Sequence, residues 1–217
     1  MLTTLAEKVD PRNAALIVVD WQNDFCLRNA GEGPDSNARP LDGVPEATAR
    51  LHQIIAEGRK AGLPIIYIAT VHGPDVDSEV WIERRRDRDH FRPLEGSWGA
   101  RLHGGLTPAE DEPVVIKHRW SAFINTELEA ALNARGVKSL IMAGTSANGC
   151  VEKTALDGFQ LDYYVVATDC MATSHPDARS MKEVFSFGAV ATADEIIACW
   201  SEAGAEKSAS RTAAGQV

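Results

Sequence analysis

The sequence lacks the basic charge that suits a nucleic-acid-binding or membrane-surface protein. Among its 217 residues, 31 acidic side chains outnumber 22 Lys and Arg, which gives a formal net charge of −9. Because binding to nucleic acid or to an anionic membrane depends on a basic surface, neither partner is expected. No apolar run approaches the roughly 18 residues of a membrane-spanning helix, and residues 1–11 lack the basic-then-apolar pattern of a signal peptide. A cytoplasmic location is therefore expected.

Cysteine is also sparse, and its four copies are scattered at Cys26, Cys150, Cys170 and Cys199. None belongs to a C-x-x-C pair or to a Cys/His cluster with zinc spacing, so neither a structural metal nor a disulfide framework is predicted. No cofactor is expected, and each cysteine is judged as a thiol. With 44% hydrophobic residues the chain can build one core, and residues 1–217 are expected to form a single domain.

Six apolar runs alternate with helix-like patterns along the chain, at residues 14–19, 64–69, 113–116, 137–143, 163–168 and 188–191. The first run is continuous and rich in β-branched residues, which is typical of a strand buried on both faces of a parallel sheet. Apolar residues at helical spacing between Val44 and Gly58 connect the first two runs as a βαβ unit. The pattern predicts an α/β fold of three layers, a doubly wound, six-stranded, mostly parallel sheet with helices on both faces.

Two segments depart from this alternation. Residues 70–112 form a connection far longer than the median of roughly 4–6 residues, which is typical of a lid or a binding segment. Residues 208–217 are small and polar, and we expect a flexible tail there. The long connection contains a run of basic residues that includes Arg84 and Arg88. These arginines either pair with acidic neighbours on a solvated helix or bind a substrate carboxylate.

Three reactive side chains come shortly after predicted strands: Asp20 after the first, Lys117 after the third and Cys150 after the fourth. The carboxyl ends of parallel strands lie at one edge of the sheet, so these side chains are expected to converge there. Each also has an ordinary structural interpretation. Asp20 suits a helix cap or a turn, Lys117 a solvated basic cluster, and Cys150 a packed, inert thiol.

The turn in front of Cys150 favours a nucleophile. Residues 144–149 are Gly, Thr, Ser, Ala, Asn and Gly, mostly small residues that allow a ligand to approach the backbone closely. A helix is expected to begin near Cys150, so its dipole and free N–H groups should lower the pKa of the thiol. The same N–H groups can stabilise an oxyanion.

Three motifs resemble those of the isochorismatase-like cysteine hydrolase family. They are Ala-Leu-Ile-Val-Val-Asp20-Trp-Gln-Asn-Asp-Phe25, Val-Val-Ile-Lys117-His-Arg-Trp-Ser121-Ala-Phe123 and Gly144-Thr-Ser-Ala-Asn-Gly-Cys150-Val-Glu-Lys-Thr-Ala155. They occur in the family's order and spacing, and together with Val165-Val-Ala-Thr-Asp169 the resemblance covers about residues 14–198. Agreement of three separate motifs makes the resemblance specific. The family's fold is the doubly wound fold expected above.

The resemblance implies a catalytic triad that hydrolyses a C–N bond. Asp20 would accept the proton of Cys150, the thiolate would attack an amide or ureido carbonyl, and Lys117 would hold the ion pair. Water would then cleave the thioester intermediate. The resemblance also implies that the amides of Ser146 and Cys150 form the oxyanion hole, and that the Thr145–Ser146 peptide bond is cis.

Departures from the family's patterns narrow the expected activity. Members that hydrolyse nicotinamide carry an Asp-x-His metal motif after the second strand, where this chain has Thr70-Val71-His72. A metal-independent enzyme is therefore expected, and His72 is interpreted as a pocket or surface residue. The enol-ether-cleaving isochorismatases typically lack the cysteine, so Cys150 favours the amidase branch. Two short segments, Gly96-Ser97-Trp98 and Asp157-Gly158-Phe159, resemble the ureidoacrylate amidohydrolase subgroup.

The substrate is expected to be a small amide or ureido compound that carries a carboxylate. Phe25, Trp98 and Phe123 lie in or near the site motifs and are candidates for an apolar pocket wall, whereas Arg84 and Arg88 are candidates for the carboxylate. The resemblance also implies a homodimer or homotetramer. Two alternatives stay open, an enol-ether hydrolase of the isochorismatase type and a catalytically silent binding protein of the same fold.

Overall fold

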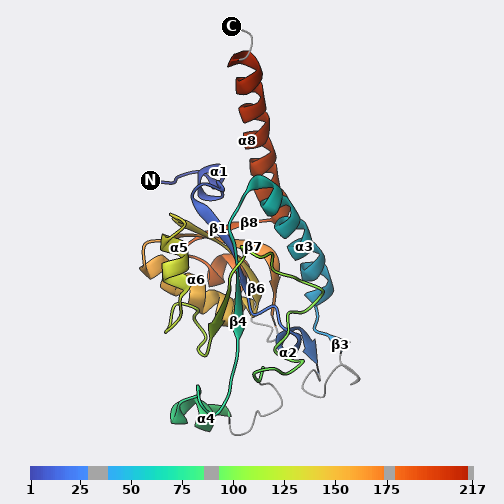
Figure 1. Cartoon of the computed structure of the whole chain (residues 1–217), viewed down its shortest axis with the longest axis vertical. Helices are drawn as coiled ribbons and strands as arrows, with labels where there is room; N and C mark the ends of the chain where they lie inside the picture. The colour runs from blue at the N-terminus through green and yellow to red at the C-terminus, as the bar shows by residue number, and fades with distance from the viewer. Residues whose placement is uncertain (29–38, 86–92, 174–178, 215–217) are drawn as a thin grey trace.

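Six parallel strands form one sheet in the order β5-β4-β1-β6-β7-β8 in the computed structural model (Figure 1). The structure describes residues 1–28, 39–85, 93–173 and 179–214 of the chain. The strands are β1 (Ala14–Val19), β4 (Ile65–Thr70), β5 (Val114–Lys117), β6 (Ser139–Thr145), β7 (Tyr164–Ala172) and β8 (Ala189–Ala191). Each strand coincides with one of the six apolar runs, so the predicted α/β fold is confirmed.

Strand β1 lies in the middle of the sheet, between β4 and β6. All six of its residues are buried, because its side chains alternate between two cores. Leu16 and Val18 pack into the core on one face, whereas Ile17 and Val19 pack into the core on the other. The continuous apolar run is therefore the pattern that a strand covered on both faces requires.

Helices cover both faces of the sheet (Figure 1). On one face lie α3 (Val44–Ala61) and α8 (Ala193–Ala214), and on the other α5 (Leu128–Asn133), α6 (Glu152–Gln160) and α7 (Met181–Val184). Helix α3 buries Val44, Leu51 and Ile54 at helical spacing, as predicted. Trp200 of α8 donates its indole N–H to the Val9 carbonyl at 2.7 Å, which joins α8 to the chain just after α1 (Leu5–Lys8).

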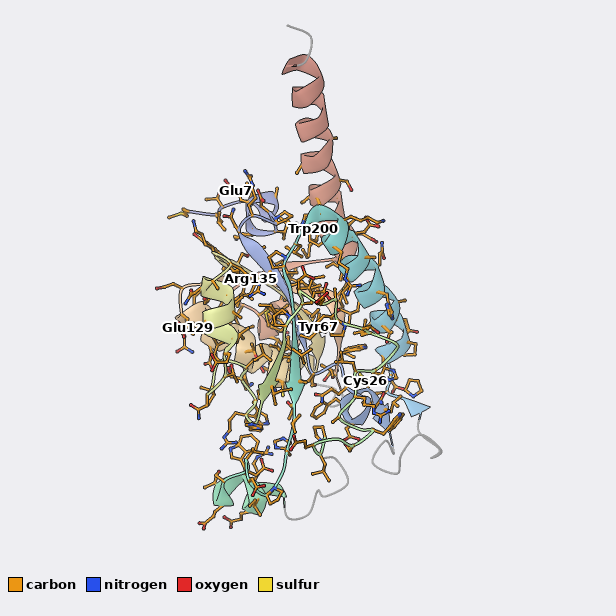
Figure 2. The ribbon with its side chains drawn as sticks, in the orientation of Figure 1. Glu7, Cys26, Tyr67, Glu129, Arg135 and Trp200 are labelled. Carbon is orange, nitrogen blue, oxygen red and sulfur yellow. The ribbon has the colours of Figure 1, made fainter. Side chains whose placement is uncertain are left out.

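Several short elements gather at the carboxyl ends of the strands. They are α2 (Asn23–Cys26), β2 (Leu27–Arg28), β3 (Arg39–Pro40) and α4 (Glu79–Arg85). In Figure 2, Cys26 of α2 lies near this end of the molecule and Trp200 of α8 near the opposite end. The chain thus places its short elements at the carboxyl edge of the sheet, the edge at which α/β proteins bind ligands.

The long connection at residues 70–112 has two parts in the structure. Helix α4 projects from the carboxyl edge of the sheet (Figure 1). Residues 97–106 instead lie along the chain that follows β1, where the Asn23 amide donates to the Arg101 carbonyl and the His103 amide to the Trp21 carbonyl. Backbone hydrogen bonds therefore hold this second part of the connection against the carboxyl edge of the sheet. A lid function for the connection stays a prediction.

The segment expected to be a flexible tail, residues 208–217, overlaps the end of α8, which continues to Ala214. Its flexibility, like the single-domain assignment, stays a prediction. Within the described ranges, no helix combines the length and the apolar character that a membrane crossing requires.

Candidate active site

The predicted triad residues come together at the carboxyl edge of the sheet. The Nζ atom of Lys117, at the end of β5, is 2.8 Å from Oδ2 of Asp20, which follows β1. Because β4 lies between β1 and β5, the two side chains meet across the end of β4. Cys150 follows β6, on the other side of β1, and its thiol interacts electrostatically with both charged groups. The convergence expected from the strand-end positions is therefore present.

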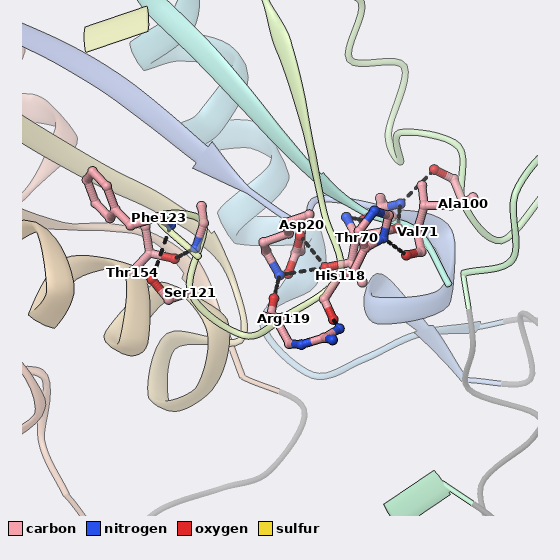
Figure 3. Close-up of polar contacts among 12 residues, drawn as sticks. Asp20, Thr70, Val71, Ala100, His118, Arg119, Ser121, Phe123 and Thr154 are labelled. Atoms are coloured by element: carbon pink, nitrogen blue, oxygen red, sulfur yellow. Dashed lines mark hydrogen bonds and ion pairs between the residues drawn. The ribbon is translucent and has the colours of Figure 1, made fainter. Parts of the chain in front are cut away.

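Lys117 is a fully buried ammonium group. Besides its ion pair with Asp20, its Nζ donates to the Thr70 hydroxyl at 2.6 Å and to the Arg119 carbonyl at 2.9 Å (Figure 3). Burial alone lowers the pKa of a lysine, but the interactions of the ammonium with Asp20 and with the Cys150 sulfur outweigh it and raise the pKa of Lys117. The ammonium is therefore charged at neutral pH. Its interpretation as part of a solvated basic cluster is wrong.

Asp20 is also buried, and its two carboxylate oxygens have different surroundings. Oδ1 accepts a hydrogen bond from the Thr70 hydroxyl at 2.9 Å (Figure 3). Oδ2 is paired with Lys117 but accepts no hydrogen bond from the described residues. The backbone of Asp20 has a φ of 51°, a left-handed conformation that is uncommon outside Gly, Asn and Asp and is frequent at functional sites.

Cys150 is partly exposed, whereas Cys26 and Cys170 are fully buried. Burial of the thiol and the negative charge of Asp20 raise the pKa of Cys150 to about 12, although Lys117 opposes them. The prediction that the helix start lowers this pKa is wrong, because the thiol is buried and a carboxylate lies beside it. Cys150 therefore keeps its proton at neutral pH and has a neighbouring carboxylate that can accept it.

A tight turn presents Cys150 at the end of β6. The Thr145–Ser146 peptide bond is cis, as the family resemblance implies. Residues Ala147–Val151 form a kinked turn, with non-helical backbone angles at Asn148 and Gly149, that leads into α6. The Asn148 Oδ1 atom accepts hydrogen bonds from the hydroxyls of Ser146, at 3.0 Å, and Thr173, at 2.7 Å. Since Thr173 follows β7, this network ties the turn of the nucleophile to the neighbouring strand.

The three aromatic candidates for the pocket wall are separated in the structure. Phe25 belongs to α2, and the Trp98 carbonyl accepts from Asn23 Nδ2 at 3.0 Å, so both lie beside the chain that follows β1. Phe123 packs in the core on the α5 and α6 face, with its ring centroid 5.9 Å from that of Tyr163. The structure therefore brings Phe25 and Trp98 to one side of the edge and places Phe123 elsewhere. Substrate contact stays a prediction for all three.

Of the two arginine candidates, the structure describes one. The guanidinium of Arg84, in α4, stacks over the Trp120 ring at 4.6 Å from its centroid and lies 6.0 Å from that of Trp81. These cation–π contacts hold α4 against the segment that follows Lys117. Arg88 lies outside the described residues. Binding of a substrate carboxylate by either arginine stays a prediction.

Two supporting residues were not selected by the sequence reasoning. Thr70, the last residue of β4, makes hydrogen bonds with both Asp20 and Lys117. Gln22 is fully buried, and its side-chain amide accepts from the Thr70 amide at 2.8 Å and donates to the Thr70 carbonyl at 2.9 Å. The strand-end position that singles out Asp20 would also have found Thr70. Gln22 carries no comparable signal.

His72 is a buried residue with a structural partner, so its interpretation as a surface residue is wrong. Its Nδ1 is 2.7 Å from Oδ1 of Asp77, and its ring stacks on Trp81 with the centroids 6.3 Å apart. In the parts of the chain that the structure describes, no three His, Cys, Asp or Glu side chains are grouped so that they could hold a metal ion.

Comparison with known proteins identifies the family. Residues 14–195 match the model of the isochorismatase domain, and the chain therefore belongs to the isochorismatase family. The resemblance based on three motifs is confirmed.

Among the particular relatives are ureidoacrylate amidohydrolases. The chain is 32% identical to RutB of Methylobacterium radiotolerans over 78% of this chain and 71% of the relative. It is 28% identical to RutB of Pseudomonas syringae pv. syringae over 91% of this chain and 87% of the relative. The structure resembles that of a cysteine hydrolase from Pseudomonas syringae pv. phaseolicola, with a TM-score of 0.75 and 26% identity over 89% of this chain and 94% of that one.

Proposed function

We propose that the protein is a cysteine amidohydrolase that cleaves a C–N bond of a small ureido or amide compound. The observation that carries the proposal is the meeting of Asp20, Lys117 and Cys150, a protonated thiol beside a carboxylate and a buried ammonium. This arrangement supplies a nucleophile, a base and a positive charge in one place. The name of the ureidoacrylate amidohydrolase relatives supports a ureido substrate that carries a carboxylate.

In the first half of the reaction, Asp20 takes the thiol proton as Sγ of Cys150 attacks the substrate carbonyl. The C–S bond forms, and the electron pair of the carbonyl moves to its oxygen. Because the thiol is protonated at rest, deprotonation and attack occur together once substrate is bound. Asp20 then gives the proton to the leaving nitrogen as the C–N bond breaks, and an amine or ammonia departs.

In the second half, water hydrolyses the thioester on Cys150. Asp20, again a carboxylate, accepts a proton as the water oxygen attacks the thioester carbon. The C–S bond breaks, the sulfur recovers a proton, and the acid product leaves. The two halves add one water molecule across the C–N bond, and Lys117 keeps its charge throughout.

The backbone amides of Ser146 and Cys150 are the proposed oxyanion donors. Both belong to the turn that presents the nucleophile, so the oxyanion forms next to them. Phe25 and Trp98, beside the chain that follows Asp20, are the proposed apolar wall of the pocket. Arg84 and Arg88 remain the proposed partners of the substrate carboxylate.

Cysteine replacement tests the mechanism. Ammonia release from ureidoacrylate and a panel of small amides is measured for the wild type, Cys150→Ser and Cys199→Ser, with thermal unfolding as the check on folding. We expect Cys150→Ser to lose at least about a thousandfold in turnover, and Cys199→Ser, a change in α8, to keep full turnover. Prior dialysis against a chelator should leave the wild-type rate unchanged, because Thr70 stands where a metal motif needs a carboxylate.

Three outcomes of this assay contradict the proposal. Undiminished turnover in Cys150→Ser excludes a thiol nucleophile. Hydrolysis of isochorismate, assayed separately because it releases no ammonia, indicates the enol-ether branch if it survives this change. Absence of turnover with every compound indicates a catalytically silent binding protein.

We also infer that the enzyme is a cytoplasmic homodimer or homotetramer. The family resemblance supports an oligomer, and so do exposed apolar side chains on the edge strand β5, Val114 and Ile116, and on α4, Val80 and Ile82. Subcellular fractionation tests the location. Neither nucleic acid nor a membrane is proposed as a partner.

A further inference from the structure

Thr70 bridges the two charged groups of the triad. It is a buried residue at the end of β4, the strand that separates β1 from β5. Its hydroxyl accepts a hydrogen bond from Lys117 Nζ at 2.6 Å and donates its single proton to Oδ1 of Asp20 at 2.9 Å (Figure 3). The hydroxyl therefore accepts a hydrogen bond from one charged group and donates one to the other. It contacts both charged side chains and so helps to hold them in place.

The bridge makes the two oxygens of Asp20 unequal. Oδ1 receives the proton of Thr70, whereas Oδ2 is buried and accepts no hydrogen bond from the described part of the chain. Oδ2 lies 2.8 Å from the Lys117 ammonium as an ion pair. Each carboxylate oxygen therefore faces one partner, the hydroxyl at Oδ1 and the ammonium at Oδ2. The two contacts together fix the orientation of the carboxylate.

The position of Thr70 is itself tightly set. Gln22 holds both polar groups of the Thr70 backbone, and its Nε2 also donates to the Ala100 carbonyl at 2.8 Å. A β-branched side chain has few χ1 rotamers, so a held backbone also orients the hydroxyl. The hydroxyl is therefore preorganised by the strand end and by Gln22, and substrate is not needed to place it.

We propose that Thr70 is a positioning residue of the triad, whose hydroxyl holds the Asp20 carboxylate beside Lys117 in the orientation in which it takes the proton of Cys150. The inference rests on the proposed cysteine hydrolase function. Without the hydroxyl, the carboxylate can turn about its χ angles, and its orientation toward the thiol is no longer enforced. Proton transfer suffers, and substrate binding does not.

The test compares Thr70→Val, Thr70→Ser and Thr168→Val. Valine removes the hydroxyl and keeps the shape, and serine keeps the hydroxyl. Thr168 is the matched control, a fully buried residue of β7 whose hydroxyl also makes two hydrogen bonds, to the Met142 carbonyl and the Cys170 amide. Thr70→Ala is a second variant without the hydroxyl, and its smaller side chain causes no steric clash.

We expect Thr70→Val and Thr70→Ala to lower kcat by about 10- to 100-fold with KM unchanged. Thr70→Ser should restore kcat. Thr168→Val should keep the wild-type kcat and KM, even where it unfolds at a lower temperature. A merely structural role would lower the unfolding temperature without this selective loss of kcat.

An unchanged kcat in the hydroxyl-free variants overturns the proposal. So do equal losses in Thr70→Ser or Thr168→Val, which would indicate a general loss of packing. A wild type without turnover counts against the proposed function, and the pH dependence of Cys150 alkylation by iodoacetamide then tests Thr70 alone. Its midpoint should shift in Thr70→Val and stay in place in Thr70→Ser. An unshifted midpoint contradicts the inference.

Discussion

The Cys150 thiol lies beside a carboxylate and an ammonium group that act on its pKa in opposite directions. Burial and Asp20 raise the pKa, Lys117 lowers it, and the resulting pKa of the thiol is about 12. The resting nucleophile is therefore a thiol, and its proton is part of the chemistry of attack. At the scale of single residues, burial and Asp20 keep Cys150 protonated, although Lys117 opposes them.

Asp20→Asn is expected to make Cys150 more reactive toward alkylation while abolishing turnover. The change removes the charge that raises the pKa of Cys150 and leaves Lys117, so the thiolate fraction at pH 8 should rise at least about tenfold. Turnover fails because the base is gone. The rate of reaction with iodoacetamide, mapped to Cys150 by mass spectrometry, measures the effect. Asp75→Asn, on the surface, is the control, and slower or unchanged alkylation in Asp20→Asn would contradict this account.

Asp24 is a second buried carboxyl near the site. Burial raises its pKa to about 6, and its Oδ1 has no hydrogen-bond partner among the described residues. The carboxyl lies so close to Gly99 that a Cβ there would be 2.2 Å from either oxygen. Because the unfolded chain ionises near the ordinary value, folding favours the protonated form of Asp24 between about pH 4 and pH 6.

Asp24 should therefore reduce stability as the pH rises from about 4 to 6. In that window the folded chain binds more protons than the unfolded chain, so the free energy of unfolding falls with pH. Asp24→Asn removes the titration, and its stability relative to wild type should be higher at pH 7 than at pH 4 by about 2 kcal/mol. Urea unfolding at the two pH values measures this difference. The exposed Asp75→Asn should show none, and an equal difference in both variants would rule out burial of Asp24 as the cause.

At the scale of elements, β6 can approach β1 closely at its carboxyl end because it carries Gly144. The residue pairs with Val19 in the sheet and has a φ of 119°. A Cβ at this position would lie 2.0 Å from the Val19 carbonyl oxygen, which is backbone and cannot move aside. The packing of β6 on β1 next to Asp20 thus depends on the absence of a side chain.

Gly144→Ala is expected to destabilise the fold by about 3 kcal/mol or more. The clash separates the ends of β1 and β6, so Asp20 and Cys150 also move apart and turnover falls. Gly136→Ala is the matched control, because Gly136 also has a positive φ, 64°, but open space around it. This control variant should lower the free energy of unfolding by about 1 to 2 kcal/mol, because only the positive φ disfavours an alanine there. Equal unfolding temperatures for the two variants would show that the contact with Val19 is unimportant.

For the whole molecule, the proposed oligomer can be tested by mass. One chain has a mass of 23.5 kDa. Light scattering after gel filtration should give twice or four times this value at micromolar concentration, because association covers apolar side chains that are exposed on one chain, such as Val114 and Ile116. A single-chain mass at all concentrations would contradict the proposal.

The sequence by itself determined the order and type of the main elements. Continuous β-branched runs such as residues 14–19 identify buried strands, because each such strand is covered on both faces and needs apolar residues at every position. Strand ends then indicated Asp20, Lys117 and Cys150, since parallel strands bring their carboxyl ends to one edge. Both inferences depend on local pattern and on topology, which a sequence carries.

Only the tertiary structure determined the burial, the neighbouring charges and the hydrogen bonds of those residues. The pKa of Cys150 depends on burial of the thiol and on Asp20 and Lys117, which are distant in sequence, so the local helix argument pointed in the wrong direction. The roles of Thr70 and Gln22 likewise come from hydrogen bonds between strand ends. Electrostatic and hydrogen-bond energies depend on distances in space, and these are set only when the strands pack side by side.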